Sequence, residues 1–185
     1  MIVAIVGPSG SGKTYLAEKL KDHFRDKIKI GLSDTTRSPR EGEVDGVHYN
    51  FVSVAEFEQK RDDAQYVEHI EFHGNYYGFD KDEFVNHKHQ PVVVVVEPDG
   101  LKALVEHFGP EYIDCIYLDV PKNVRFGRML KERGNKAAKE RIEDGIQERF
   151  HHNFANQKIY FRLYMLDDNM RAYDIFCDKI ASYCS

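Results

Sequence analysis

Short apolar runs alternate with segments of helical spacing along most of this sequence. Residues 2–6 are all apolar, and Leu16 and Leu20 follow one turn apart, which predicts a buried strand and then a helix over residues 15–24. Residues 91–96 are apolar on both faces, which is typical of a central parallel strand. The pattern predicts further strands at residues 28–32, 66–72, 112–120 and 165–166, and further helices at residues 52–60, 82–89, 99–107, from 122 onward with an interruption at Gly134 and Asn135, and 169–183.

The segments between these elements are rich in turn residues. Residues 33–51 predict a loop that leads into a short hairpin, and residues 73–78 predict a turn that carries two tyrosines. Ser53 and Glu56 have the spacing of a capping box at the start of the 52–60 helix. Because strands alternate with helices throughout, the sequence predicts an α/β fold, with one parallel sheet wrapped on both faces.

A glycine-rich stretch joins the first strand to the first helix. Residues 7–14 fit the pattern G-x-x-x-x-G-K-[ST], in which main-chain N–H groups and a helix N-terminus surround phosphate groups. Lys13 can reach the β- and γ-phosphates, and the Thr14 hydroxyl can bind Mg²⁺. The candidate ATP-binding residues are Gly7, Ser9, Gly10, Ser11, Gly12, Lys13 and Thr14.

Two arginines mark a second candidate anion site. Arg37 and Arg40 flank Pro39, and two guanidinium groups held in this way suit a phosphate dianion. Glu97 follows the apolar run at 91–96, at the strand end where ligands bind in open α/β sheets. The arginine pair by itself fits either an anion site or a solvated surface, and Glu97 marks a separate candidate position at the strand end.

Composition limits the partners and the compartment. The chain has 185 residues and a net charge of −5, so it lacks the basic balance of a nucleic-acid binder. Its three cysteines form no disulfide framework, which favours a reducing cytoplasm. The sequence shows no signal peptide and no membrane helix, and we expect a monomer or homodimer that acts on small molecules.

The sequence resembles the guanylate kinase family over nearly its whole length. The specific part is residues 33–51, with the pattern Ser-x-Thr-Thr-Arg-x-Pro-Arg-x-Gly-Glu-x-x-Gly-x-x-Tyr-x-Phe, which Glu68 and residues 74–78 extend. The resemblance implies a P-loop NTPase-type three-layer α/β/α fold in one domain. Its parts would be a core (1–32, 81–121 and 142–185), a small mixed GMP-binding insertion (33–80) and a helical lid (122–141).

The resemblance also implies roles for individual residues in ATP-dependent phosphorylation of GMP, and of dGMP. The implied GMP-binding residues are Ser33, Arg37, Arg40, Tyr49, Glu68, Tyr77 and Glu97, with Glu68 and Ser33 at the guanine edge. The implied catalytic residues are Lys13, Arg37, Arg133 and Arg141, and the implied ligands of Mg²⁺ are Thr14 and Glu97. ATP and Mg²⁺ are the expected cofactors.

Three features depart from the family pattern. Phe79 replaces a small hydroxyl residue near the base, Val95 replaces an Asp, and the segment between Arg133 and Arg141 is shorter than usual. We expect Phe79 to loosen the preference for guanine. Two alternatives stay open on the sequence: a related kinase with a different phosphorylated acceptor, and a non-catalytic module that binds phosphopeptides.

Overall fold

The computed structural model describes residues 1–72, 74–85, 90–142, 145–155, 162–166 and 169–184. Some of these residues, among them 132–137, 140 and 141, are described by their backbone alone. The large sheet consists of β1 (Ile2–Val6), β2 (Lys29–Ile30), β7 (Val92–Val95), β8 (Ile113–Leu118) and β9 (Arg162–Leu166). The helices are α1 (Lys13–Phe24), α2 (Val54–Asp62), α3 (Asp82–Val85), α4 (Pro98–Phe108), α5 (Lys122–Arg141), α6 (Ile146–Phe150) and α7 (Asn169–Tyr183), with short turns η1 (Arg25–Lys27), η2 (Pro110–Tyr112) and η3 (His151–Ala155).

The large sheet is parallel throughout, as the sequence predicts. Its five strands lie in the order β2-β7-β1-β8-β9. Ile2 of β1 is in register with Val92 of β7 on one side and Ile113 of β8 on the other. The middle strand is therefore β1, and the valine-rich β7 lies beside it rather than at the centre. Both faces of the sheet are covered by packed cores, which explains why both strands are apolar along their whole length.

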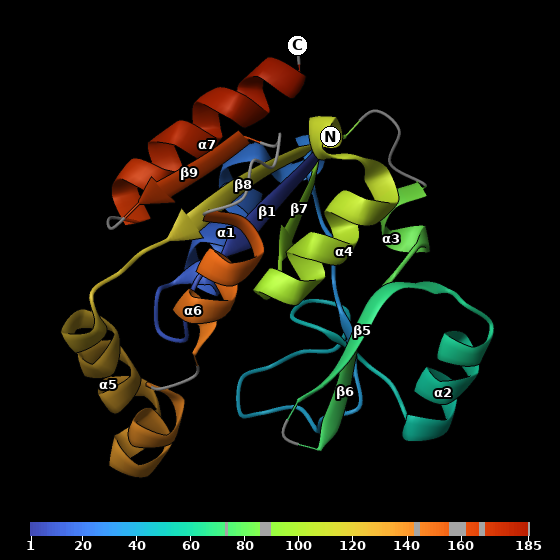
Figure 1. Cartoon of the computed structure of the whole chain (residues 1–185), viewed down its shortest axis with the longest axis horizontal. Helices are drawn as coiled ribbons and strands as arrows, with labels where there is room; N and C mark the ends of the chain where they lie inside the picture. The colour runs from blue at the N-terminus through green and yellow to red at the C-terminus, as the bar shows by residue number, and fades with distance from the viewer. Residues whose placement is uncertain (73, 86–89, 143–144, 156–161, 167–168, 185) are drawn as a thin grey trace.

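Alternate side chains of β1 enter two separate cores, one on each face of this sheet. Val3 and Ile5 pack with residues of α1 and α7, whereas Ile2, Ala4 and Val6 pack with residues of α4, α6 and η3. Figure 1 shows α4 and α6 in front of the sheet and α1 behind it. The period of two along a strand thus produces the three-layer α/β/α arrangement.

A second, mixed sheet contains β3 (Asp34–Thr35), β4 (Asn50–Phe51), β5 (Tyr66–Phe72) and β6 (Asn75–Asp80), in the order β4-β3-β6-β5. The predicted hairpin in residues 33–51 is wrong, because β3 and β4 pair in parallel. The predicted turn at 73–78 is also wrong in most of its length. Residues from 75 onward form β6, which is paired with β3 on one side and β5 on the other.

Hydrogen bonds from Thr35 and Thr36 explain why the tyrosine segment is a strand. The Thr35 Oγ1 donates to Tyr76 O at 3.0 Å, and Tyr76 N donates to Thr36 Oγ1 at 2.9 Å. These partners are 40 or more residues away in the sequence. Local turn chemistry predicts a turn here, but the distant threonines provide the pairing that makes a strand.

The capping box at the start of α2 is confirmed. Glu56 N donates to Ser53 Oγ at 3.1 Å, and Ser53 N donates to Glu56 Oε2 at 2.8 Å. At the other end of α2, Lys60 Nζ lies 2.7 Å from Asp34 Oδ2 and 2.9 Å from Asp80 Oδ2. Because Asp34 is fully buried in β3, this ion pair fixes α2 on the small sheet.

Two helix predictions need correction or fall partly outside the described chain. Gly134 and Asn135 do not interrupt α5, which runs continuously to Arg141. Within the predicted 82–89 helix, α3 spans Asp82–Val85, and residues 86–89 are outside the described part. Figure 1 shows α5 and the β5–β6 ribbon at the same end of the large sheet, on opposite sides. Among the described helices, none is long and apolar enough to cross a membrane.

Candidate active site

The glycine-rich loop lies between the end of β1 and the start of α1. Gly12 occupies the N-cap position with a left-handed backbone (φ 93°), and Gly10 has φ 78°. A Cβ on Gly10 would lie 2.9 Å from Arg125 O, so the loop passes too close to α5 for any larger residue. The first N–H groups of α1 therefore open directly onto the loop, as an anion site requires.

Lys13 lies at the start of α1 and turns back over this loop. Its ammonium group donates to Gly7 O and lies 3.8 Å from Glu97 Oε1. Glu97 is the N-cap residue of α4, directly after β7. The predicted pairing of loop and strand end is thus present, with the lysine ammonium between a main-chain oxygen and a carboxylate.

Arg149 of α6 lies at the same place and was missed by the sequence analysis. Its Nη2 is 3.9 Å from Glu97 Oε2, and its Nε is 3.9 Å from Asp99 Oδ2. Glu97 therefore has Lys13 on one side and Arg149 on the other. Arg149 follows the predicted lid in the sequence, but an isolated arginine in a helix does not reveal which residue it will contact.

Two arginines at the start of α5 contact the back of the glycine-rich loop. Arg125, which is 7% exposed, donates from Nη1 to Ser9 O at 3.2 Å and from Nε to Val120 O at 3.1 Å. Arg128 Nη1 donates to Ser11 O at 3.1 Å. These contacts use loop carbonyls, so the two arginines do not occupy N–H groups of the loop. The sequence shows a basic helix here but not which of its residues meet the loop.

Arg37 is held by Glu43 through one edge of its guanidinium group. Nη1 lies 2.8 Å from Glu43 Oε2, and Nη2 lies 3.0 Å from Glu43 Oε1. Nη1 also donates to Ser38 O at 2.8 Å. The Nε atom is buried and has no hydrogen-bond partner among the described residues. Nε is therefore the donor that remains for a ligand, beside the Tyr77 side chain, which also interacts with the guanidinium group.

Two tyrosines that the resemblance assigns to the same site lie beside this arginine. The guanidinium carbon lies 5.2 Å from the ring centre of Tyr49, and the rings of Tyr49 and Tyr77 meet edge-on at 6.2 Å. Burial raises the pKa of Tyr49, so its phenol keeps the proton that it can donate. Arg40 belongs to the same group, because its main-chain N donates to Glu43 Oε2 at 2.7 Å.

Glu43 was not among the predicted site residues, although it lies within the sequence pattern. Burial opposes its ionisation, but hydrogen bonds from the Arg37 side chain and the Arg40 main chain hold the pKa of Glu43 below its ordinary value. The carboxylate thus fixes the orientation of Arg37 as a permanent anion. The same loop also approaches α1, since His48 Nε2 lies 3.9 Å from Glu18 Oε1.

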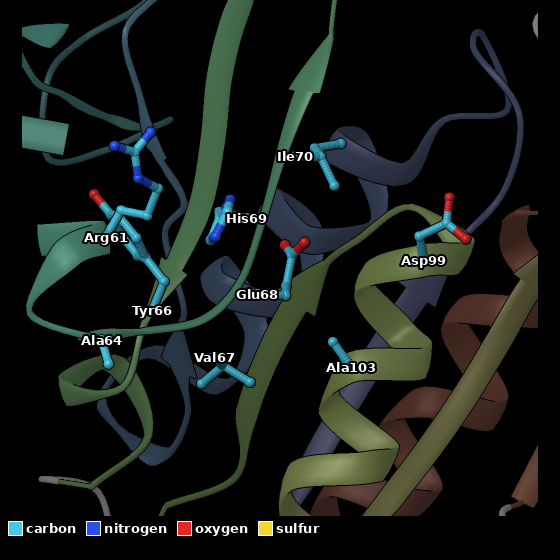
Figure 2. Close-up of a pocket in the computed structure, with 9 residues that line it drawn as sticks. All are labelled: Arg61, Ala64, Tyr66, Val67, Glu68, His69, Ile70, Asp99 and Ala103. Atoms are coloured by element: carbon cyan, nitrogen blue, oxygen red, sulfur yellow. The ribbon is translucent and has the colours of Figure 1, made fainter. Parts of the chain in front are cut away.

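Glu68 on β5 faces the start of α4. Figure 2 shows its carboxylate on the same side of the strand as Asp99, in a pocket of about 400 Å³ between β5 and α4. Gly100 permits this approach, because a Cβ there would lie 3.2 Å from Glu68 Oε1. Burial, with a smaller effect of Asp99 and Glu97, raises the pKa of Glu68 to about 7.

Phe79 does not occupy the position that the sequence suggests. It is the cross-strand partner of Glu68, yet its side chain is 2% exposed and packs in the core with Phe84, at a ring distance of 6.0 Å. The ring therefore supports the strand from inside. Position 79 has no hydroxyl group, as the sequence shows, but the phenylalanine ring lies in the core.

Three further predicted residues have less defined surroundings. Ser33 is half-buried beside β3, and its carbonyl accepts from Asn50 N at 3.0 Å. The backbones of Arg133 and Arg141 lie on α5, but their side chains are outside the described part of the chain.

The residues predicted to bind Mg²⁺ suit this ion by their chemistry. Thr14 is exposed in the first turn of α1. The carboxylate of Glu97 lies 3.8 Å from the ammonium group of Lys13, which is next to Thr14 in the sequence. A hydroxyl and a carboxylate are oxygen ligands, and Mg²⁺ usually needs only one or two of them besides phosphate and water. The fit therefore requires no further protein ligand.

The chain matches the family model described as Guanylate kinase over residues 1–173. It is 40% identical over 132 residues to a guanylate kinase of Campylobacter jejuni (strain RM1221), a match that covers 70% of this chain and 64% of the relative. It is 35% identical over 135 residues to the guanylate kinase of Wolinella succinogenes, covering 72% and 62%. The matched part thus spans less than two thirds of these relatives.

Solved structures show a similar fold. The guanylate kinase from Anaplasma phagocytophilum superposes with a TM-score of 0.71 at 21% identity, covering 98% of this chain and 85% of that one. At this identity the likeness concerns the fold alone, whereas the family model covers nearly the whole sequence. This chain belongs to the guanylate kinase family.

Proposed function

We propose that this protein transfers the γ-phosphoryl group of ATP to GMP, and also to dGMP, in the cytoplasm. The observation that carries this proposal is the free edge of Arg37, whose buried Nε has no partner among the described residues. A buried N–H without a partner is costly, so an acceptor is expected at this edge when the site is in use. A phosphate dianion can accept from Nε and Nη2 together.

The glycine-rich loop supports ATP as the donor. Its N–H groups and the start of α1 would hold the β- and γ-phosphates, and Lys13 would exchange its contact with Glu97 for the γ-phosphate. Mg²⁺ held near Thr14 and Glu97 would supply further positive charge to the phosphates. Arg149 would neutralise Glu97 after Lys13 leaves, because it already lies 3.9 Å away.

Phosphoryl transfer needs alignment and charge more than covalent chemistry from the protein. Arg37, Arg40, Tyr49 and Tyr77 would fix the acceptor phosphate, with Glu43 holding Arg37 in place. Arg133 and Arg141 stay proposed as lid residues that approach the phosphates. Glu68 would accept hydrogen bonds from N1–H and the 2-amino group of guanine, with Ser33 beside it.

A panel of nucleoside monophosphates with ATP and Mg²⁺, scored for ADP release, tests the proposal. We expect ADP release with GMP and dGMP to exceed that with AMP, CMP and UMP at neutral pH. Release with another monophosphate alone would indicate a different acceptor. No release with any of them, together with binding of a phosphopeptide, would indicate the non-catalytic module.

A further inference from the structure

Under the proposed function, the carboxyl group of Glu68 meets the edge of the purine base, and this inference rests on that function. In the pocket of about 400 Å³, the neighbours of Glu68 along the strand are the apolar residues Val67 and Ile70 and the exposed His69. Glu68 makes no hydrogen bond to any described residue with its carboxyl group, so both oxygens are open to a ligand. The protonation of this one carboxyl group then determines which base edge is complementary.

The two protonation states of Glu68 match two different bases. A carboxylate has two acceptor oxygens and suits the two donors of guanine, N1–H and the 2-amino group. A carboxylic acid has one donor and one acceptor and suits a base whose N1 is an acceptor beside a 2-amino donor. 2-Aminopurine has this second edge, and a mismatch in either state leaves polar groups unpaired.

The charges around Glu68 favour retention of the proton near neutral pH. Asp99 and Glu97 of α4 both act on Glu68, and burial raises its pKa to about 7. Arg149 of α6 lies 3.9 Å from each of these two carboxylates, so its positive charge offsets the charges of Glu97 and Asp99 rather than that of Glu68. Arg61 of α2 and His69 of β5 line the same pocket, and Figure 2 shows both on the other side of the β5 ribbon from the Glu68 carboxylate.

The residue paired with Glu68 on the neighbouring strand has no side-chain donor. Phe79 is the cross-strand partner of Glu68, and its side chain is 2% exposed in an apolar core. Position 79 therefore offers no hydroxyl group to the 6-oxygen of guanine. The loss of the 6-oxygen in 2-aminopurine leaves no protein donor unpaired at this position.

We propose that the acceptor site also takes 2-aminopurine riboside 5′-monophosphate, and that gain or loss of a proton by Glu68 selects between this nucleotide and GMP. The ionised form takes GMP, and the protonated form takes the 2-aminopurine nucleotide. Both substrates share the same phosphate contacts and the same ATP site, so effects of pH on those parts cancel in the ratio of their kcat/KM values.

The test is this ratio, GMP over the 2-aminopurine nucleotide, measured between about pH 6 and pH 8. We expect the ratio to rise about tenfold per pH unit, because one substrate requires the ionised form of a single group and the other its protonated form. The slope does not depend on the value of the pKa. A ratio that stays constant with pH, while GMP is phosphorylated, would overturn the inference and leave the proposed function intact. Absence of GMP phosphorylation at every pH would overturn both.

Glu68→Gln removes the titration and keeps the shape of the side chain. Its amide presents a donor and an acceptor at every pH, so we expect a flat ratio that favours the 2-aminopurine nucleotide. Glu71→Gln is the matched control, since Glu71 is exposed on the same strand, and it should keep the slope of the unmodified protein. A Glu68→Gln protein that keeps this slope would contradict the assignment, and if that variant does not fold, the slope of the unmodified protein decides alone.

Discussion

The two proposed anion sites of this molecule are built in different ways. The loop between β1 and α1 presents main-chain N–H groups, and its geometry depends on Gly10 and Gly12 in left-handed conformations. The site around Arg37 is built from side chains of a mixed sheet, and its geometry depends on Glu43 and on stacking with Tyr49. The first kind of site is specified by local sequence, whereas the second requires contacts between distant segments.

The two sites also differ in how their cations are neutralised before a ligand arrives. Lys13 is 3.8 Å from Glu97, a loose contact that a phosphate can replace. Arg37 is bound by both oxygens of Glu43 at 2.8 and 3.0 Å, and we expect this pairing to persist when a phosphate binds at the other edge. The lysine is therefore a mobile charge and the arginine a fixed one.

Removal of the mobile charge should have the largest effect on activity. We expect Lys13→Ala to lower kcat by at least about 100-fold, since a preorganised donor to the transferring group is removed. Thermal unfolding should be nearly unchanged, because Lys13 contributes nothing to either core. Lys21→Ala, an exposed lysine of the same helix, is the control. Equal activity in the Lys13→Ala protein would contradict the role of the loop.

The proposed acceptor region, residues 33–80, should depend strongly on the core side chain that anchors it. We expect Phe79→Ala to lower the free energy of unfolding by about 3 kcal/mol, because Phe79 connects β6 to the large core. Urea denaturation measures this change. Val85→Ala, at a position that is 54% exposed, should change it by less than about 0.5 kcal/mol. A similar small change for Phe79→Ala would mean that β6 is not anchored in that core.

Loss of one arginine from the side-chain site should raise the KM for GMP and leave the KM for ATP unchanged. We expect Arg40→Ala to raise the KM for GMP by about tenfold, which corresponds to one charged hydrogen bond. The KM for ATP should not change, since Arg40 lies in the acceptor region. Arg171→Ala, an exposed arginine on α7, serves as the control. An unchanged KM for GMP in a coupled assay would remove Arg40 from the site.

The smallest effect should come from a residue that supports α2 without touching either site. We expect Ser53→Ala to lower the free energy of unfolding by about 1 kcal/mol, because the capping box loses its hydroxyl acceptor. Neither KM should change. A shift in the KM for GMP would show that α2 is coupled to the acceptor site more closely than its contacts indicate.

The same contrast explains which parts of the fold the sequence predicts. The large parallel sheet, the glycine-rich loop and the Ser53 cap depend on short-range patterns, and all three are confirmed. The pairing of β3 with β4 and the extension of β6 were predicted incorrectly. The extension of β6 depends on Thr35 and Thr36, which contact Tyr76 across a long stretch of sequence. The pairing of β3 with β4 depends on main-chain hydrogen bonds from Asn50 and Val52 to Ser33 and Thr35, which are also distant in sequence.

For the candidate site, the sequence indicates the residues proposed to contact phosphate but not the residues that hold them in place. Glu43 lies within the pattern of residues 33–51, but the pattern does not show that it pairs with Arg37. Arg149 lies outside that pattern, and only the fold brings it to Glu97. The direction of Phe79 was equally hidden, because a residue in a strand can face the core or the ligand. Gly134 and Asn135 show the opposite case, where local signals of a break are overridden in a continuous helix.

The most direct test of the account is the ¹⁵N–¹H resonance of the Arg37 Nε group, assigned by comparison with an Arg37→Lys protein. We predict that GMP shifts this resonance strongly and that guanosine, which lacks the phosphate, leaves it in place. A resonance that stays unchanged at saturating GMP, while main-chain signals of the acceptor region move, would contradict the claim that the open edge of Arg37 holds the acceptor phosphate.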